Sequence, residues 1–74
     1  MSISMKLIMN PAPGAILRVI GLAERRGYDP LFLSAEHLGE KLVMYMTVRA
    51  DRPIHIFVSH VQKMFGMNSV EVMS

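Results

Sequence analysis

The loop at residues 10–15 is the stretch of this sequence whose residue types could bind a charged ligand. It reads Asn-Pro-Ala-Pro-Gly-Ala and runs into a predicted helix. The first N–H groups of a helix have no partner within the helix, and the helix dipole favours an anion there. Gly14 permits a close approach, so the N–H groups of Gly14 and Ala15 could receive a carboxylate. A plain strand-to-helix turn is the commoner use of such a sequence.

The histidines and carboxylates do not form a recognisable site. His55 and His60 are five residues apart in a predicted helix, so their side chains point about 140° apart, unlike the i, i+4 pair that binds zinc. His37 lies in a predicted turn. We interpret these groups as solvated, together with three carboxylates that only a chance strand register would pair: Asp29, Glu36 and Glu40.

Several kinds of chemistry lack their residues altogether. The chain has no cysteine, which excludes disulfides and thiolate metal sites. No serine or threonine sits in a nucleophile elbow, and no glycine-rich phosphate loop follows a strand. Tyr45 is the one aromatic residue available for base stacking on the middle of the predicted sheet, so we expect no nucleic acid partner. The sequence therefore predicts no catalytic residue, no metal and no cofactor in this chain.

Length and composition favour a small domain that associates. The chain has 74 residues, of which 51% are hydrophobic, and a formal net charge of +2. One domain of this size is only marginally stable alone and often gains stability from a partner. No apolar run approaches the roughly 20 residues of a membrane span. The default expectation is a cytoplasmic protein with no membrane contact.

The first half of the chain predicts a strand, a helix and a second strand. Ile3, Met5, Leu7 and Met9 alternate with polar residues, which indicates a half-buried strand over residues 2–9. An amphipathic helix opens at Pro13 and Gly14 and closes at Gly27. A strand follows over residues 28–36, with a hairpin connection at 37–40. The helix buries one apolar face, flanked by Leu17 and Leu22: Ile16, Val19, Ile20 and Ala23.

The second half repeats the pattern. Residues 42–49 are largely apolar on both faces, which indicates a central strand. Asp51 is the expected N-cap of a second helix, with Pro53 just inside it, and Gly66 ends that helix. Residues 68–73 form a last strand. Six side chains should line the buried face of the second helix: Ile54, Phe57, Val58, Val61, Met64 and Phe65.

The resulting order, βαββαβ, predicts an α+β fold of the ferredoxin-like type across residues 1–74 as a single domain. Both helices should cover the same side of a four-stranded antiparallel sheet, with the first and third strands in the middle. The second strand is then an edge. Leu31, Phe32 and Leu33 place apolar groups on both of its faces, so we expect homodimers joined along this strand, around residues 32–35.

Residues 14–22 read Gly-Ala-Ile-Leu-Arg-Val-Ile-Gly-Leu, and residues 25–28 read Arg-Arg-Gly-Tyr. This run resembles the first helix of the small, regulatory subunits of acetolactate (acetohydroxyacid) synthase, which carry an ACT domain. Residues 46–48 and 61–70 match later parts of the same pattern. The resemblance spans nearly the whole chain and implies the short, single-ACT-domain type.

That resemblance implies a non-catalytic regulatory subunit in branched-chain amino acid biosynthesis. Such subunits bind and activate a large catalytic subunit and often pass on inhibition by a branched-chain amino acid. Thiamine diphosphate, magnesium and FAD would belong to the catalytic partner. ACT domains pair through their second strands and hold the amino acid between the first loop and the neighbouring domain. The effector-binding residues implied here are Asn10, Gly14, Ala15 and Asp29.

Two positions depart from the longer members of that family. Their first-loop asparagine stands where this chain has Pro11, one residue after Asn10, and their Tyr-Asn-Ile is Tyr28-Asp29-Pro30 here. An amide can pair with both ends of an amino acid. We therefore expect weak effector binding and an intact subunit role.

Two other functions remain open. The main alternative is a free-standing ACT-type sensor that binds an amino acid and regulates another protein. A weaker one is an acylphosphatase-like enzyme, which needs an arginine and an asparagine converging on a phosphate.

Overall fold

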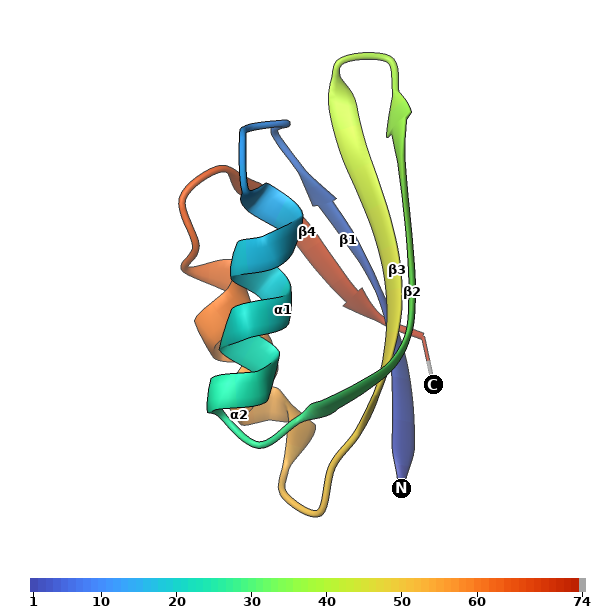
Figure 1. Ribbon diagram of the computed structural model, residues 1–74, viewed down its shortest axis with the longest axis vertical. Coiled ribbons are helices and arrows are strands. Elements are labelled where there is room, and N and C mark those ends of the chain that lie inside the picture. Colours follow the sequence, from blue (N-terminus) through green and yellow to red (C-terminus); the bar gives the residue numbers. More distant parts are fainter. Residues whose placement is uncertain (74) are drawn as a thin grey trace.

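The computed structural model describes residues 1–73, which form four strands and two helices in the predicted order. The strands make one antiparallel sheet in the order β2-β3-β1-β4, so the first and third strands occupy the middle, as predicted. Both helices cover the same face of the sheet (Figure 1). This is the predicted ferredoxin-like arrangement. Its elements are β1 (Ser2–Met9), α1 (Ala15–Arg25), β2 (Asp29–Leu38), β3 (Lys41–Arg49), α2 (Ile54–Gln62) and β4 (Met67–Val72).

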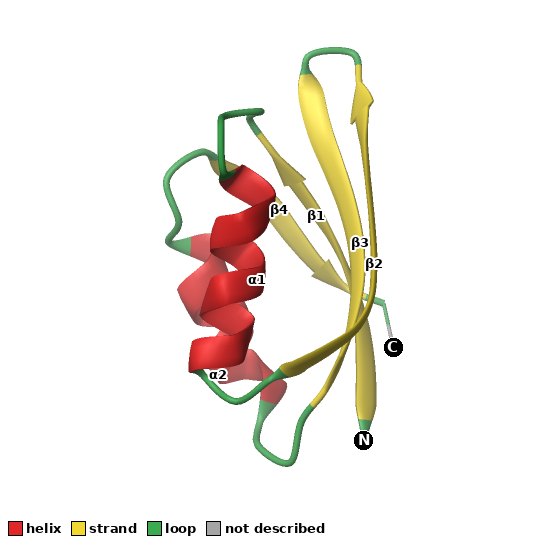
Figure 2. Cartoon of the chain, in the orientation of Figure 1, coloured by secondary structure: helices red, strands yellow, loops and turns green. Residues whose placement is uncertain are grey.

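The core lies between the two middle strands and the helices, where Figure 2 shows the helical layer against the sheet. Met5 of β1 pairs with Met46 of β3, and Leu7 pairs with Met44. All four side chains are buried. The alternation of apolar residues in the sequence therefore does point one face of β1 and β3 into the core, as a period of two requires.

Glycines with positive φ bracket α1. Gly14 is the N-cap with φ of 78°, and Gly27 follows the helix with φ of 83°. At the C-terminal end the N–H of Gly27 donates to the carbonyl of Glu24, and the N–H of Tyr28 donates to that of Ala23. This pair of hydrogen bonds is a Schellman motif, which satisfies two carbonyls and turns the chain sharply.

Tyr28 was predicted to begin the second strand, but that is wrong. The turn at Gly27 directs its ring into the core, where it is buried and lies 5.0 Å from the ring of Phe57. Its hydroxyl donates a 2.8 Å hydrogen bond to the carbonyl of Pro53. Tyr28 thus joins the end of α1 to the start of α2, a role in packing that strand alternation could not reveal.

The predicted bounds of α2 need two corrections. Asp51 is not the N-cap: Pro53 holds that position, and no side chain caps the helix. The helix also ends at Gln62, where Lys63 and Met64 donate to carbonyls three residues back. Such tightening moves the following residues off the helical face. Phe65 is consequently 99% exposed rather than buried, whereas Phe57 and Val61 are in the core as predicted.

The hairpin between β2 and β3 is shorter than predicted. The strand β2 continues to Leu38, which pairs with Lys41, so Gly39 and Glu40 form a two-residue turn. Gly39 has φ of 61° and Glu40 does not have positive φ, which is the pattern of a type II′ turn. His37 therefore lies on the strand, opposite Leu42. The strand β2 is an edge, as Pro30 within it suggested.

Candidate functional site

The loop between β1 and α1 forms a tight turn at the N-terminal end of α1. The N–H of Ala15 donates a 3.1 Å hydrogen bond to the carbonyl of Ala12, and the N–H of Arg18 makes the first bond of the helix to Gly14. Gly14 tolerates its positive φ because it has no Cβ. The N–H of Ala15 is thus already used, and a carboxylate at this end would approach Gly14 and the other first-turn N–H groups.

A hollow of about 210 Å³ opens beside this turn. Its volume lies below the 300–1,000 Å³ typical of sites for drug-sized ligands, so it suits a small metabolite. Gly14 and Ala15, two of the predicted effector residues, are both part of its wall. The lining residues are Pro11, Ala12, Gly14, Ala15, Ile16, Leu17, His37 and Leu42.

His37 is a residue of this hollow that the sequence analysis missed. Leu33 and Ala35 pack against the core, and His37 follows them on the same face of β2. The imidazole therefore lies on the helix side of the edge strand, near the start of α1. Continuing the two-residue alternation past Ala35 would have placed His37 on the strand and on this face. The position of the hairpin turn decides which face His37 occupies, because a one-residue shift of the register exchanges the two faces.

Asn10 lies next to the hollow and does not line it. Its side-chain Oδ1 accepts a 2.8 Å hydrogen bond from Lys41 Nζ, which also donates to Asn68 Oδ1 at 3.0 Å. The amide oxygen that could contact an amino acid is therefore held by a lysine of β3.

Asp29 lies at the other end of α1, at the start of β2. Its Oδ2 accepts a 3.0 Å hydrogen bond from Arg49 Nη2, and both side chains are largely exposed. An 11-residue helix is about 16 Å long, so Asp29 is remote from Gly14 within one chain. The structure brings Gly14 and Ala15 together, places Asn10 beside them and leaves Asp29 apart.

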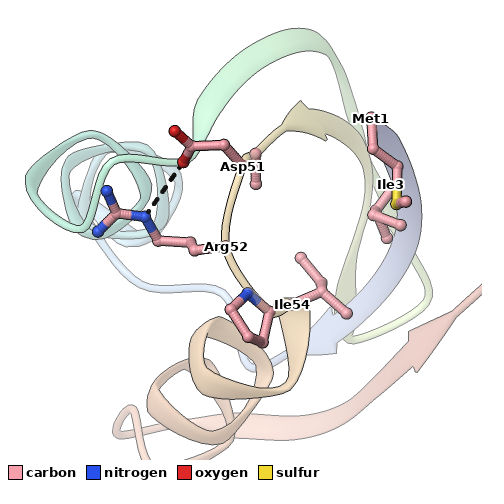
Figure 3. Close-up of a pocket in the computed structure, with 7 residues that line it drawn as sticks. Met1, Ile3, Asp51, Arg52 and Ile54 are labelled. Carbon is pink, nitrogen blue, oxygen red and sulfur yellow. Dashed lines mark ion pairs between the residues drawn. The ribbon is translucent and has the colours of Figure 1, made fainter.

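A larger hollow of about 450 Å³ lies at the end of the sheet that holds Asp29 (Figure 3). Its walls are mainly apolar, from Met1, Ile3 and Ile54. Arg52 Nη1 donates to the carbonyl of Arg26, and its Nε lies 3.6 Å from the Asp51 carboxylate. Asp51 and Arg52 are thus paired with each other, and Arg52 also holds the end of α1.

The described part of the chain holds no group of three histidines or carboxylates that could bind a metal ion. His55 is exposed and His60 is half-buried, on different sides of α2. Neither α1 nor α2 is long and apolar enough to cross a membrane. We take the hollow at the start of α1 as the candidate site, because Gly14 and Ala15 line it.

Residues 11–70 match the ACT domain family. The chain belongs to this family. No curated protein sequence matches it. ACT domains are small-molecule-sensing regulatory modules rather than catalysts, and the proteins that carry them commonly dimerise and regulate partner enzymes.

Three solved ACT structures superpose on this ACT domain. The acetolactate synthase small subunit from Thermotoga maritima has a TM-score of 0.85 at 16% identity, over 100% of this chain and 48% of that chain. The ACT domain from GTP pyrophosphokinase of Chlorobium tepidum has a TM-score of 0.83 at 8% identity, over 97% of this chain and 96% of that chain. An ACT domain protein from Streptococcus pneumoniae has a TM-score of 0.82 at 15% identity, over 100% of this chain and 89% of that chain. At these identities the likeness shows the fold alone, and this chain spans about half of the T. maritima subunit.

Proposed function

We propose that this ACT domain is a non-catalytic, activating subunit of acetolactate synthase in branched-chain amino acid biosynthesis. The observation that carries the proposal is the run at residues 14–22. It resembles the first helix of acetolactate synthase small subunits, and here it forms the turn and helix that wall the candidate hollow. The T. maritima small subunit has the same fold over the whole of this chain, as the proposal requires.

The partner in this proposal is the large catalytic subunit, which would hold thiamine diphosphate, magnesium and FAD. The ACT domain would occupy residues 1–74, of which Ser74 lies outside the described residues, and it would act in the cytoplasm. Binding of this chain to the large subunit would raise the activity of the partner's active site, and a coupling free energy between the two sites would describe that effect.

A homodimer through β2 is part of the same proposal. Leu31 and Phe32 on this edge strand are about half exposed, and Leu17 on the adjoining flank of α1 is 72% exposed. An open edge with apolar side chains needs a cover. Antiparallel pairing of two β2 strands would bring Asp29 of the second copy toward His37 of the first, and so toward the hollow at Gly14.

The effector proposed for this shared site is a branched-chain amino acid, bound with its carboxylate at the start of α1. Gly14 and Ala15 would form the turn, with Asn10 beside it and Asp29 supplied by the second copy. Asn10 and Asp29 already have partners in Lys41 and Arg49. Binding would have to break or share these contacts, which supports weak affinity.

The direct test is to assay purified large subunit with and without this chain. We expect activation by this chain and no turnover by the chain alone. The isolated ACT domain from GTP pyrophosphokinase is the matched control, because it has the same fold at 8% identity. No change in activity at saturating concentration would refute the subunit role.

The second candidate is a free-standing ACT-type sensor that regulates another protein. The ACT family match favours it, because ACT domains are small-molecule-sensing regulatory modules. A gene beside that of a large thiamine-diphosphate enzyme would favour the subunit. A gene in another neighbourhood, together with measurable amino acid binding by the chain, would favour the sensor.

A further inference from the structure

Phe65 is an aromatic side chain with no place in the core. It lies between α2 and β4 and is 99% exposed, more than any other large hydrophobic side chain of the described chain. A single exposed hydrophobic residue is ordinary on a protein surface and needs no explanation. The surroundings of Phe65 are what make it informative.

The loop that carries Phe65 is tied to the loop before α1. The N–H of Asn10 donates a 2.8 Å hydrogen bond to the carbonyl of Gly66. Figure 1 shows the two loops at the same end of the molecule, opposite the N-terminus. Pro11 and Pro13 stiffen the first loop, and both are exposed. Phe65 therefore projects from a double loop in which Pro11 and Pro13 are exposed as well.

Three cations surround this double loop. Arg18 Nη1 reaches the carbonyl of Pro13 at 3.4 Å, and Lys41 Nζ bonds Asn10 Oδ1. Lys63 precedes Phe65 by two residues. The hairpin turn at this end contributes one carboxylate, Glu40. These four side chains carry a summed charge of +2, so the surface around the double loop is locally positive.

We propose that Phe65 is the anchor of a protein–protein interface and inserts into an apolar pocket rimmed by carboxylates on the partner. The inference rests on the proposed function, in which that partner is the catalytic subunit. Interfaces commonly depend on a central aromatic anchor, with charges at the rim that set orientation and association rate. Phe65 with Arg18, Lys41 and Lys63 has this composition.

The position of Phe65 also provides a route by which effector binding could alter binding to the partner. The Asn10–Gly66 hydrogen bond joins the loop of the candidate hollow to the loop of Phe65. A ligand that orders the first loop therefore acts on the second, and linkage requires that partner binding alters ligand affinity by the same factor.

The experiment measures the dissociation constant of the full chain for purified large subunit by titration calorimetry. Phe65→Ala should weaken binding about 30-fold, the usual loss at an aromatic hot spot. Its apolar control is Met73→Ala, a half-exposed side chain at the opposite end of the sheet. Lys63→Gln should weaken binding less and flatten its salt dependence, with the exposed Arg26→Gln as the charge control. All four variants should keep the melting temperature of the wild type.

The outcomes separate the two proposals. Unchanged affinity of Phe65→Ala, with wild type binding normally, overturns the anchor and leaves the subunit role intact. A wild type that does not bind the large subunit overturns both. Binding of the wild type to anionic phospholipid vesicles, lost in Phe65→Ala, would replace the protein partner by a membrane surface and would also overturn the inference. Weaker binding of Phe65→Ala, with unchanged affinity of the controls Met73→Ala and Arg26→Gln, supports the inference.

Discussion

The hydroxyl of Tyr28 donates a 2.8 Å hydrogen bond to the carbonyl oxygen of Pro53, across 25 residues of sequence. Pro53 is the N-cap of α2, and Tyr28 follows the glycine that ends α1. One buried side chain thus holds the end of one helix against the start of the other. Because α1 also forms the wall of the candidate hollow, this bond contributes to the placement of the site.

Replacing Tyr28 by phenylalanine should lower the free energy of unfolding by about 1 kcal/mol, because the Pro53 carbonyl loses its donor while the ring stays packed on Phe57. Urea unfolding measures it. Tyr45→Phe is the control, since that ring lies on the open face of the sheet near Lys6, 5.7 Å from Nζ, and should unfold like the wild type. Equal losses for the two variants would refute a specific role for the Tyr28 hydroxyl.

Two glycine-to-alanine changes in and before α1 should act in opposite directions. Gly14→Ala should destabilise by about 1–2 kcal/mol, because alanine is strained at φ of 78°. Gly21→Ala should stabilise by up to about 1 kcal/mol, because Gly21 is within the helix. The new methyl group would lie 3.2 Å from Arg25 Nη1, the end of a flexible side chain that can move. Chemical denaturation of both variants tests this, and a stabilising Gly14→Ala would contradict the assigned backbone conformation.

Charges on the open edge of β2 should prevent self-association. We expect a dimer for the wild type at about 50 μM and a monomer for the double variant Leu31→Lys, Phe32→Lys, because lysines on an edge strand block pairing. Sedimentation velocity distinguishes the two. Val72→Lys, on the other edge strand, is the control and should remain dimeric. A wild type that sediments as a monomer would show that the β2 edge is protected in another way.

Valine, leucine and isoleucine should bind weakly or not at all. The amide oxygen of Asn10 and the carboxylate of Asp29 are held by Lys41 and Arg49, and the family asparagines are missing. Orienting hydrogen bonds to charged groups contribute about 1.5–3 kcal/mol each, so the loss of two weakens binding by about 100-fold or more. Titration calorimetry with each amino acid decides this. Low-micromolar affinity would mean that Asn10 and Asp29 exchange their partners for the ligand.

The sequence by itself determined the order of elements and most of the core. Alternation at Met5 and Leu7 encodes a strand with one buried face, and Gly14 and Gly27 bracket α1, because these signals depend on neighbouring residues alone. The same local information favoured a plain turn at Gly14, and only the family resemblance implied a ligand site there. The structure places that turn in the wall of a hollow, and the ligand site stays a prediction.

Tertiary structure decided the remainder. Phe65 has the right spacing for the buried face of α2, but the helix tightens and ends before reaching it. Tyr28 fits a strand pattern, yet the Schellman turn directs it between the helices. The partners of Asn10 and Asp29 depend on strand order and register, which bring residues 31 and 20 positions away within hydrogen-bonding distance. Local periodicity specifies which face a side chain occupies; only the pairing of distant strands specifies what that side chain touches.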